Sequence, residues 1–232
     1  MIPLRDDQPR FSTPYVTYFL IGLNLVIFLF ESALTPESFK TLLYELGMVP
    51  ANITAYLSGY GRLGLVAVLL PGLTSMFLHG SWMHVIGNMW FLWIFGDNIE
   101  DHLGHFLYLL FYLASGLGAA FAQVILTPHS IVPTVGASGA IAGVLGAYFV
   151  LYPRARVLIW FPILFLFYLP AWVTLGYWFA MQFLSGAATA IAAYSDTRGG
   201  VAFWAHVGGF VAGIVLIKLL PERPRRYRYG AW

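Results

Sequence analysis

The chain has 232 residues, of which 59% are hydrophobic and only 9% are charged. A water-soluble domain usually carries about 25% charged residues, so the polar side chains are too few for a water-facing surface and indicate a lipid-facing one. The net charge of +2 and its scatter argue against nucleic-acid binding, and the absence of cysteine excludes disulfides and thiolate metal sites.

The first segment, residues 1–13, is polar and lacks an apolar core followed by a small-residue cleavage site. We therefore expect no removable signal peptide. Crossing a bilayer takes roughly 20 mostly apolar residues. Six stretches meet or approach this length: 14–33, 79–96, 103–126, 136–152, 170–193 and 201–220.

Two shorter apolar runs, 63–70 and 157–169, are followed or interrupted by proline. We interpret both as interfacial or re-entrant pieces, with Pro170 in the first turn of the fifth helix. A seventh span at 157–169 is the alternative. The expected fold is an all-α membrane protein, a bundle of six transmembrane helices over 14–220, followed by a basic tail at 221–232.

The distribution of positive charge decides between six and seven spans. With six spans the two termini share a side, and the segments on that side hold nine of the twelve Lys and Arg residues. Because cytoplasmic segments carry an excess of Lys and Arg, we expect both termini to be cytoplasmic and the membrane to be the plasma membrane. A seventh span would place the basic tail on the opposite side.

Several polar residues lie inside the apolar stretches, where they are costly and often functional. His79, His84 and Asn88 lie in the first half of the second span, and Ser138 begins the fourth. His206 lies about five residues into the sixth span, or about 7–8 Å at 1.5 Å per residue. These three spans run in the same direction, so the five residues are predicted to share one outer layer of the membrane.

Ser138 is surrounded by small residues. Gly136 precedes it, and Gly139 and Gly143 form a GxxxG pair that favours close helix packing. A serine in such a run is often structural, and packing alone is the alternative interpretation of this segment.

His206, Gly209 and Gly213 fall on one helix face of the sixth span. A histidine within a membrane is often only a buried hydrogen-bonding residue. However, glycines on both helices allow a close approach, and Ser138 and His206 share a depth. We expect their side chains to meet, with the imidazole activating the serine hydroxyl as a nucleophile.

His84 and Asn88 are four residues apart and share a helix face. They either hydrogen-bond to neighbouring helices or, with the Ser138 backbone N–H, donate to an oxyanion. We favour the second interpretation because of the predicted dyad. His79 is a further candidate for this role, although near a helix start it can also face water.

No metal or cofactor is expected. The sequence has no HExxH motif, and the three histidines of the outer layer lack an acidic residue at their depth. The glycines lie in helices rather than after a strand, which argues against a nucleotide-binding loop.

With these residues placed, the chain resembles the rhomboid family of intramembrane serine proteases. The resemblance rests on GASG around Ser138, AHVGGFVAG around His206 and HGSWMHVIGN (79–88), and it extends over GDNIEDHLG, YLASG and LPAW. It implies that Ser138 is the nucleophile, that His206 is the general base, and that His84 and Asn88 stabilise the oxyanion. It also implies that 35–78 is a long loop lying partly in the membrane, and that span five and the loop around 191–200 form a gate and cap.

The sequence departs from this family pattern at two places. Some members have a tyrosine four residues after the serine, stacked on the catalytic histidine, whereas this chain has Ala142. The histidine must therefore be oriented in another way. The first loop also lacks the Trp-Arg pair of many members, although Arg62 lies in that region.

The expected activity is hydrolysis of peptide bonds in or near the transmembrane helix of membrane-protein substrates. Such substrates need helix-destabilising residues, because a helical peptide bond is shielded by its neighbours. The other expected partner is the lipid bilayer. Two rival functions are an inactive rhomboid-like protein that binds membrane clients, and a transporter. Loss of the serine or histidine would favour the first, and both residues are present. The second favours charged or polar groups near the midplane and paired internal repeats, and the sequence shows neither.

Overall fold

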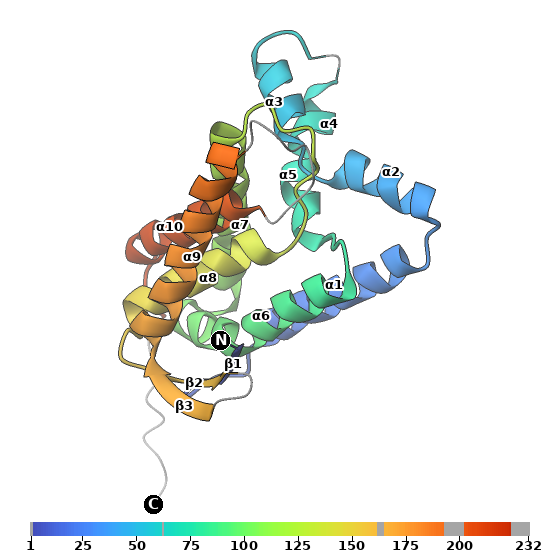
Figure 1. Ribbon diagram of the computed structural model, residues 1–232. Helices are drawn as coiled ribbons and strands as arrows, with labels where there is room; N and C mark the ends of the chain where they lie inside the picture. Colours follow the sequence, from blue (N-terminus) through green and yellow to red (C-terminus); the bar gives the residue numbers. More distant parts are fainter. Residues whose placement is uncertain (1, 62, 162–164, 193–201, 224–232) are drawn as a thin grey trace, which may run out of the picture.

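The computed structural model describes residues 2–61, 63–161, 165–192 and 202–223, and it is mostly helical (Figure 1). The expected cap at 191–200 and the last part of the basic tail lie almost wholly outside these residues. The long helices are α1 (Tyr15–Ser32), α6 (Trp82–Leu103), α7 (His105–Leu126), α8 (Ser138–Leu151), α9 (Ala171–Ala192) and α10 (Phe203–Leu219).

Each of the six expected spans overlaps one of these long helices. By length and apolarity alone, α1 and α7 qualify as membrane spans within the described residues. The segment 65–77 and α6 qualify as a pair that is bent by 77°, whereas α8 and α10 are shorter apolar helices. The structure thus has two or three candidate spans by this criterion.

Short helices fill the region between α1 and α6: α2 (Pro36–Leu46), α3 (Pro50–Leu57), α4 (Leu65–Leu69), α5 (Pro71–Thr74) and the 3-10 turn η1 (Ser75–Phe77). Proline begins α2, α3 and α5, where its missing N–H costs nothing. None of the α2 residues is buried, and α2 projects from the body of the molecule (Figure 1).

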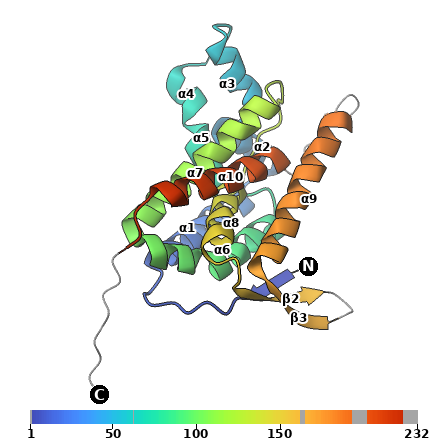
Figure 2. The ribbon, with the colours of Figure 1, turned by 90° about the vertical axis from the view of Figure 1, so that its left-hand side faces the viewer.

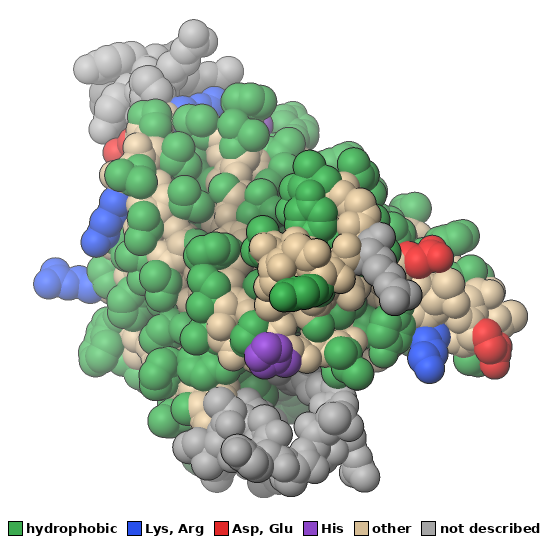
Figure 3. Space-filling model, turned by 90° about the horizontal axis from the view of Figure 1, so that it is seen from above, with side chains coloured by type: hydrophobic (Ala, Val, Ile, Leu, Met, Phe, Trp, Pro, Cys, Tyr) green, Lys and Arg blue, Asp and Glu red, His purple; other side chains and the backbone are tan. Residues whose placement is uncertain are grey.

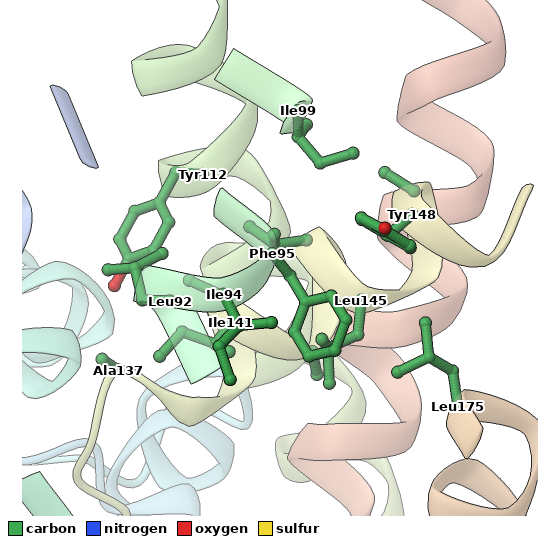
Figure 4. Close-up of a cluster of buried hydrophobic side chains, with 14 of the residues drawn as sticks. Leu92, Ile94, Phe95, Ile99, Tyr112, Ala137, Ile141, Leu145, Tyr148 and Leu175 are labelled. Carbon is green, nitrogen blue, oxygen red and sulfur yellow. The ribbon is translucent and has the colours of Figure 1, made fainter. Parts of the chain in front are cut away.

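Helix α8 forms the centre of the molecule. All ten residues from Gly139 to Tyr148 are buried, and α6, α7, α9 and α10 pack around them. Figure 4 shows Phe95 beside Leu145 of α8, in a cluster that also includes Tyr112 of α7 and Leu175 of α9. The exterior is also apolar, and few charged side chains appear on the face seen in Figure 3. An apolar core inside an apolar surface is the arrangement expected of a protein surrounded by lipid.

Glycines allow α8 and α10 to touch through their backbones. A Cβ atom at Gly209 would overlap the carbonyl oxygen of Gly139, and one at Gly213 would overlap that of Gly143. A side chain at either position would therefore force the two helices apart.

The acidic stretch after the second expected span (Asp97, Glu100 and Asp101) is helical rather than a loop. Helix α6 continues through it to Leu103, and Glu100 is fully buried. Its carboxylate accepts hydrogen bonds from the backbone N–H groups of Val16 and Thr17 at 2.9 and 2.8 Å. These N–H groups begin α1 and have no partner within that helix, so Glu100 caps α1 from a neighbouring helix.

The fold is mostly helical, as expected, but it also contains a small antiparallel sheet of three strands that the all-α prediction did not include. Strand β1 (Ile2–Arg5) pairs with β2 (Arg156–Phe161), which pairs with β3 (Phe165–Pro170). The run 157–169, expected as an interfacial or re-entrant piece, thus supplies two strands. Pro170 ends β3, and α9 begins at the next residue rather than at Pro170.

The sheet also gives the N-terminal segment a fixed position. The Trp90 indole N–H donates to the Pro3 carbonyl at 2.6 Å, and Asp7 accepts from the backbone and side chain of Arg156 at 2.8 and 3.0 Å. The sheet lies at one end of the molecule, opposite α3 and α4 (Figure 1).

The backbone contact between α8 and α10 predicts a large effect from a single methyl group. Gly209→Ala should lower the melting temperature in detergent, because overpacking of this kind typically costs about 1–3 kcal/mol or more. Gly22→Ala on α1 is the matched control, because no atom lies within 4 Å of its added methyl group. The control should melt at the wild-type temperature or slightly above it, and equal melting of all three proteins would contradict the tight contact.

Candidate active site

The structure brings Ser138 and His206 together although they are 68 residues apart. Ser138 is the first residue of α8, and His206 lies in the first turn of α10. The distance from Ser138 Oγ to His206 Nε2 is 2.8 Å, within the normal range for a hydrogen bond. The glycine contacts described above bring the two helices close enough for this bond.

The other ring nitrogen of His206 is also engaged. Its Nδ1 atom lies 2.7 Å from Oε1 of Gln182, on α9. The ring of Trp178, one turn earlier on α9, has its centroid 5.8 Å from that of His206. His206 itself is 8% exposed. Gln182 was not among the residues predicted from the sequence, although an amide side chain inside an apolar stretch was an available signal.

His84 and Asn88 lie over the turn that leads into Ser138. A Cβ atom at Gly136 would come within 2.7 Å of the His84 ring and 3.5 Å of the Asn88 amide nitrogen. Gly136 also has a φ of +123°, which disfavours residues other than glycine. Gly136 thus differs from the other glycines of the site, because it accommodates the His84 ring rather than a second helix.

His79 is buried in the protein and does not face water. Its Nε2 atom lies 2.9 Å from the amide nitrogen of Asn88, and its ring lies edge-on to that of His84, with the centroids 5.1 Å apart. Its backbone N–H donates to the carboxylate of Glu31 on α1, which is 2% exposed. In this arrangement His79 contacts the site through Asn88 and His84. Glu31 was not identified from the sequence.

The position of Ser138 also favours negative charge. As the first residue of α8 it has a backbone N–H without an intrahelical acceptor, and the helix dipole is positive at this end. A cavity of about 30 Å³ lies beside Ser138, and Ser75 and Thr134 contribute to its wall. Such a volume holds roughly one or two water molecules. The site therefore combines a serine hydroxyl, an imidazole in contact with it, nearby hydrogen-bond donors and space for water.

No group of three His, Asp or Glu side chains in the described parts of the chain is arranged to hold a metal ion. Within the same residues, His206 forms its two side-chain hydrogen bonds with neutral partners rather than with a carboxylate.

Comparison with known proteins matches residues 68–223 to the Rhomboid domain family. Rhomboid-like protein 11, chloroplastic, from Arabidopsis thaliana is 36% identical over 157 residues, which is 65% of this chain and 52% of that protein. Rhomboid protein 1, mitochondrial, from Saccharomyces cerevisiae is 29% identical over 224 residues, or 93% and 57% of the two chains. The human presenilin-associated rhomboid-like protein, mitochondrial, is 34% identical over 152 residues, or 62% and 36%.

The names of these relatives correct the expected location. All three carry a mitochondrial or chloroplastic designation. They point to an organellar membrane, so the expectation of a plasma-membrane protein with cytoplasmic termini is wrong. That expectation rested on the distribution of Lys and Arg. The distribution distinguishes the two sides of a membrane but does not show which membrane the protein occupies.

The chain spans 57% or less of the length of these three relatives. The match to the family model nevertheless covers two thirds of the chain and includes both Ser138 and His206. The chain therefore belongs to the rhomboid family.

Proposed function

We propose that the chain is an intramembrane serine endopeptidase in which Ser138 is the nucleophile and His206 is the general base. The single observation that carries the proposal is the 2.8 Å contact between Ser138 Oγ and His206 Nε2 at the N-terminus of a buried helix. Membership of the rhomboid family supports it.

In the proposed reaction, Ser138 Oγ attacks the carbonyl carbon of the scissile peptide bond while His206 Nε2 takes the hydroxyl proton. The tetrahedral intermediate carries an oxyanion, which accepts hydrogen bonds from the Ser138 N–H, His84 and Asn88. His206 then gives the proton to the leaving amine. Water from the cavity beside Ser138 hydrolyses the acyl-enzyme and regenerates the free serine.

We also propose that all six long helices traverse the membrane. The 14 residues of α8 are too few to match a bilayer, but α8 is surrounded by protein and need not match the thickness of the lipid. Substrates in this proposal are membrane proteins whose transmembrane helix is locally destabilised. A helical peptide bond has both polar groups engaged, so it must unwind before it reaches the serine.

The dyad is tested with the purified protein and a fluorophosphonate probe that reacts with activated serines. Wild type should be labelled and should cleave a membrane-anchored reporter that has helix-breaking residues in its transmembrane segment. Ser138→Ala should abolish both signals, and His206→Ala should reduce them by several orders of magnitude. The double variant should be no worse than either single one, because the residues act as a unit.

The exposed Ser38→Ala on α2 is the control for probe labelling and should match wild type. Probe labelling that persists in Ser138→Ala would overturn the assigned nucleophile. A well-folded wild type with neither labelling nor cleavage would favour an inactive, client-binding member of the family.

The oxyanion role is tested by kinetics. His84→Ala should lower kcat about 100–1,000-fold with little change in KM, because the lost interaction forms in the transition state. Asn88→Ala should have a smaller effect. If His79 acts through Asn88, the double variant His79→Ala/Asn88→Ala should have the same kcat as Asn88→Ala alone. A loss of thermal stability with normal kcat in the folded fraction would instead indicate structural roles.

The proposed crossings predict that His129 and Arg154, at opposite ends of the connection through α8, lie on opposite sides of the membrane. The natural chain has no cysteine. A single cysteine introduced at either of these exposed positions is therefore the only thiol that can react with the reagent. In sealed vesicles an impermeant thiol reagent should label one of them, and the other only after detergent is added. Labelling of both in sealed, uniformly oriented vesicles would contradict the proposed topology.

A further inference from the structure

We propose that Gln182 is the positioning residue of the dyad and that its side-chain carbonyl fixes the tautomer of His206. This inference rests on the proposed function. Two distances carry it: 2.7 Å from His206 Nδ1 to Gln182 Oε1, and 2.8 Å from His206 Nε2 to Ser138 Oγ. The two ring nitrogens of one imidazole thus contact a fixed acceptor on one side and the nucleophile on the other.

The chemistry of imidazole makes these two contacts interdependent. A neutral imidazole has one N–H and one lone pair on its two nitrogens. When Nδ1–H donates to Gln182 Oε1, the lone pair is on Nε2 and faces the Ser138 hydroxyl. The opposite tautomer would direct an N–H at Ser138 Oγ, and Nε2 would then be unable to accept the proton.

In three-residue catalytic triads a carboxylate performs this orienting role and also stabilises the imidazolium. Gln182 provides the acceptor without the charge. A charge is costly to bury in apolar surroundings unless it is paired, and His206 is 8% exposed. A neutral amide therefore suits this position, which lies on an apolar helix.

A second side chain of α9 restricts the same ring. The Trp178 ring is tilted by 38° relative to that of His206, with the centroids 5.8 Å apart, and it is four residues before Gln182 on the same helix face. Ala142, the position at which some rhomboids have a tyrosine, offers only a methyl group. The orientation of His206 is thus supplied by α9 rather than by α8.

It follows that three helices build the dyad. Helix α8 carries the serine, α10 carries the histidine, and α9 carries the groups that orient the histidine ring. Figure 2 shows α9 along one side of the bundle, with the β2–β3 hairpin at its base. Displacement of α9 would leave both reactive residues in place but would release the imidazole.

The test compares variants of one side chain in the full-length protein. Gln182→Leu removes the acceptor at similar size and should lower kcat about 10–100-fold with little change in KM, as expected for a lost hydrogen bond to a buried group. Met181→Leu places the same residue at the neighbouring exposed position of α9 and should leave kcat unchanged. Gln182→Asn, which keeps the amide but draws it away from Nδ1, should resemble Gln182→Leu.

Gln182→Glu gives the readout that a purely structural role would not produce. It restores an acceptor, so kcat at the pH optimum should return to within about tenfold of wild type. Its carboxylate would also stabilise the imidazolium of His206, so the acid limb of the kcat/KM profile should move to higher pH. Among the residues that the structure describes, His84 is the other titratable side chain expected to act on His206, and it is unchanged in all variants.

The outcomes separate this inference from the proposed function. Wild-type kcat in Gln182→Leu, with Ser138→Ala inactive, would overturn the role of Gln182 and leave the serine mechanism standing. Lower melting temperatures in all Gln182 variants, with no rescue by glutamate and no change in the pH profile, would show that Gln182 is structural. Absence of labelling and cleavage in wild type would refute the proposed function itself.

Discussion

The contact on which the rest of the structure depends is the backbone-to-backbone packing of α8 against α10. Glycine carbonyl groups of α8 occupy the space where side chains of α10 would otherwise lie. In a lipid environment there is no hydrophobic force between helices, so such close packing is a main source of their association. Ser138 and His206 have short side chains, and they meet only because these two backbones touch. The same contact therefore contributes to both the fold and the geometry of the site.

The positions of the long helices could be predicted from the sequence because they leave a strong local signal. Long apolar stretches mark the helices, and serine and histidine stand out within them. The structure places four of the predicted side chains close to the turn that leads into α8: Ser138, His206, His84 and Asn88. Their catalytic roles remain predictions. The β2–β3 hairpin could not be predicted in the same way. Nearly every residue of 157–169 is apolar, so the alternation that identifies a strand is absent.

Two further features could not be predicted because their meaning depends on distant partners. Glu100 lies in a polar stretch that resembles a loop, and its burial there depends on hydrogen bonds from the start of α1, together with a contact to His105. Gln182 is one amide in an apolar helix, and only its proximity to His206 gives it significance. Each is satisfied by a group more than 20 residues away in the sequence, which local patterns do not reveal.

The pairing of β1 with β2 constrains how the chain threads through the membrane. Strand β1 ends before α1, and β2 begins after α8, yet the two strands are hydrogen-bonded to each other and bridged by Asp7 and Arg156. Two strands of one sheet must lie on the same side of a bilayer. The polypeptide between residues 5 and 156 therefore crosses the membrane an even number of times. This parity follows from backbone pairing alone, and it holds whichever helices make the crossings and whichever compartment lies on either side.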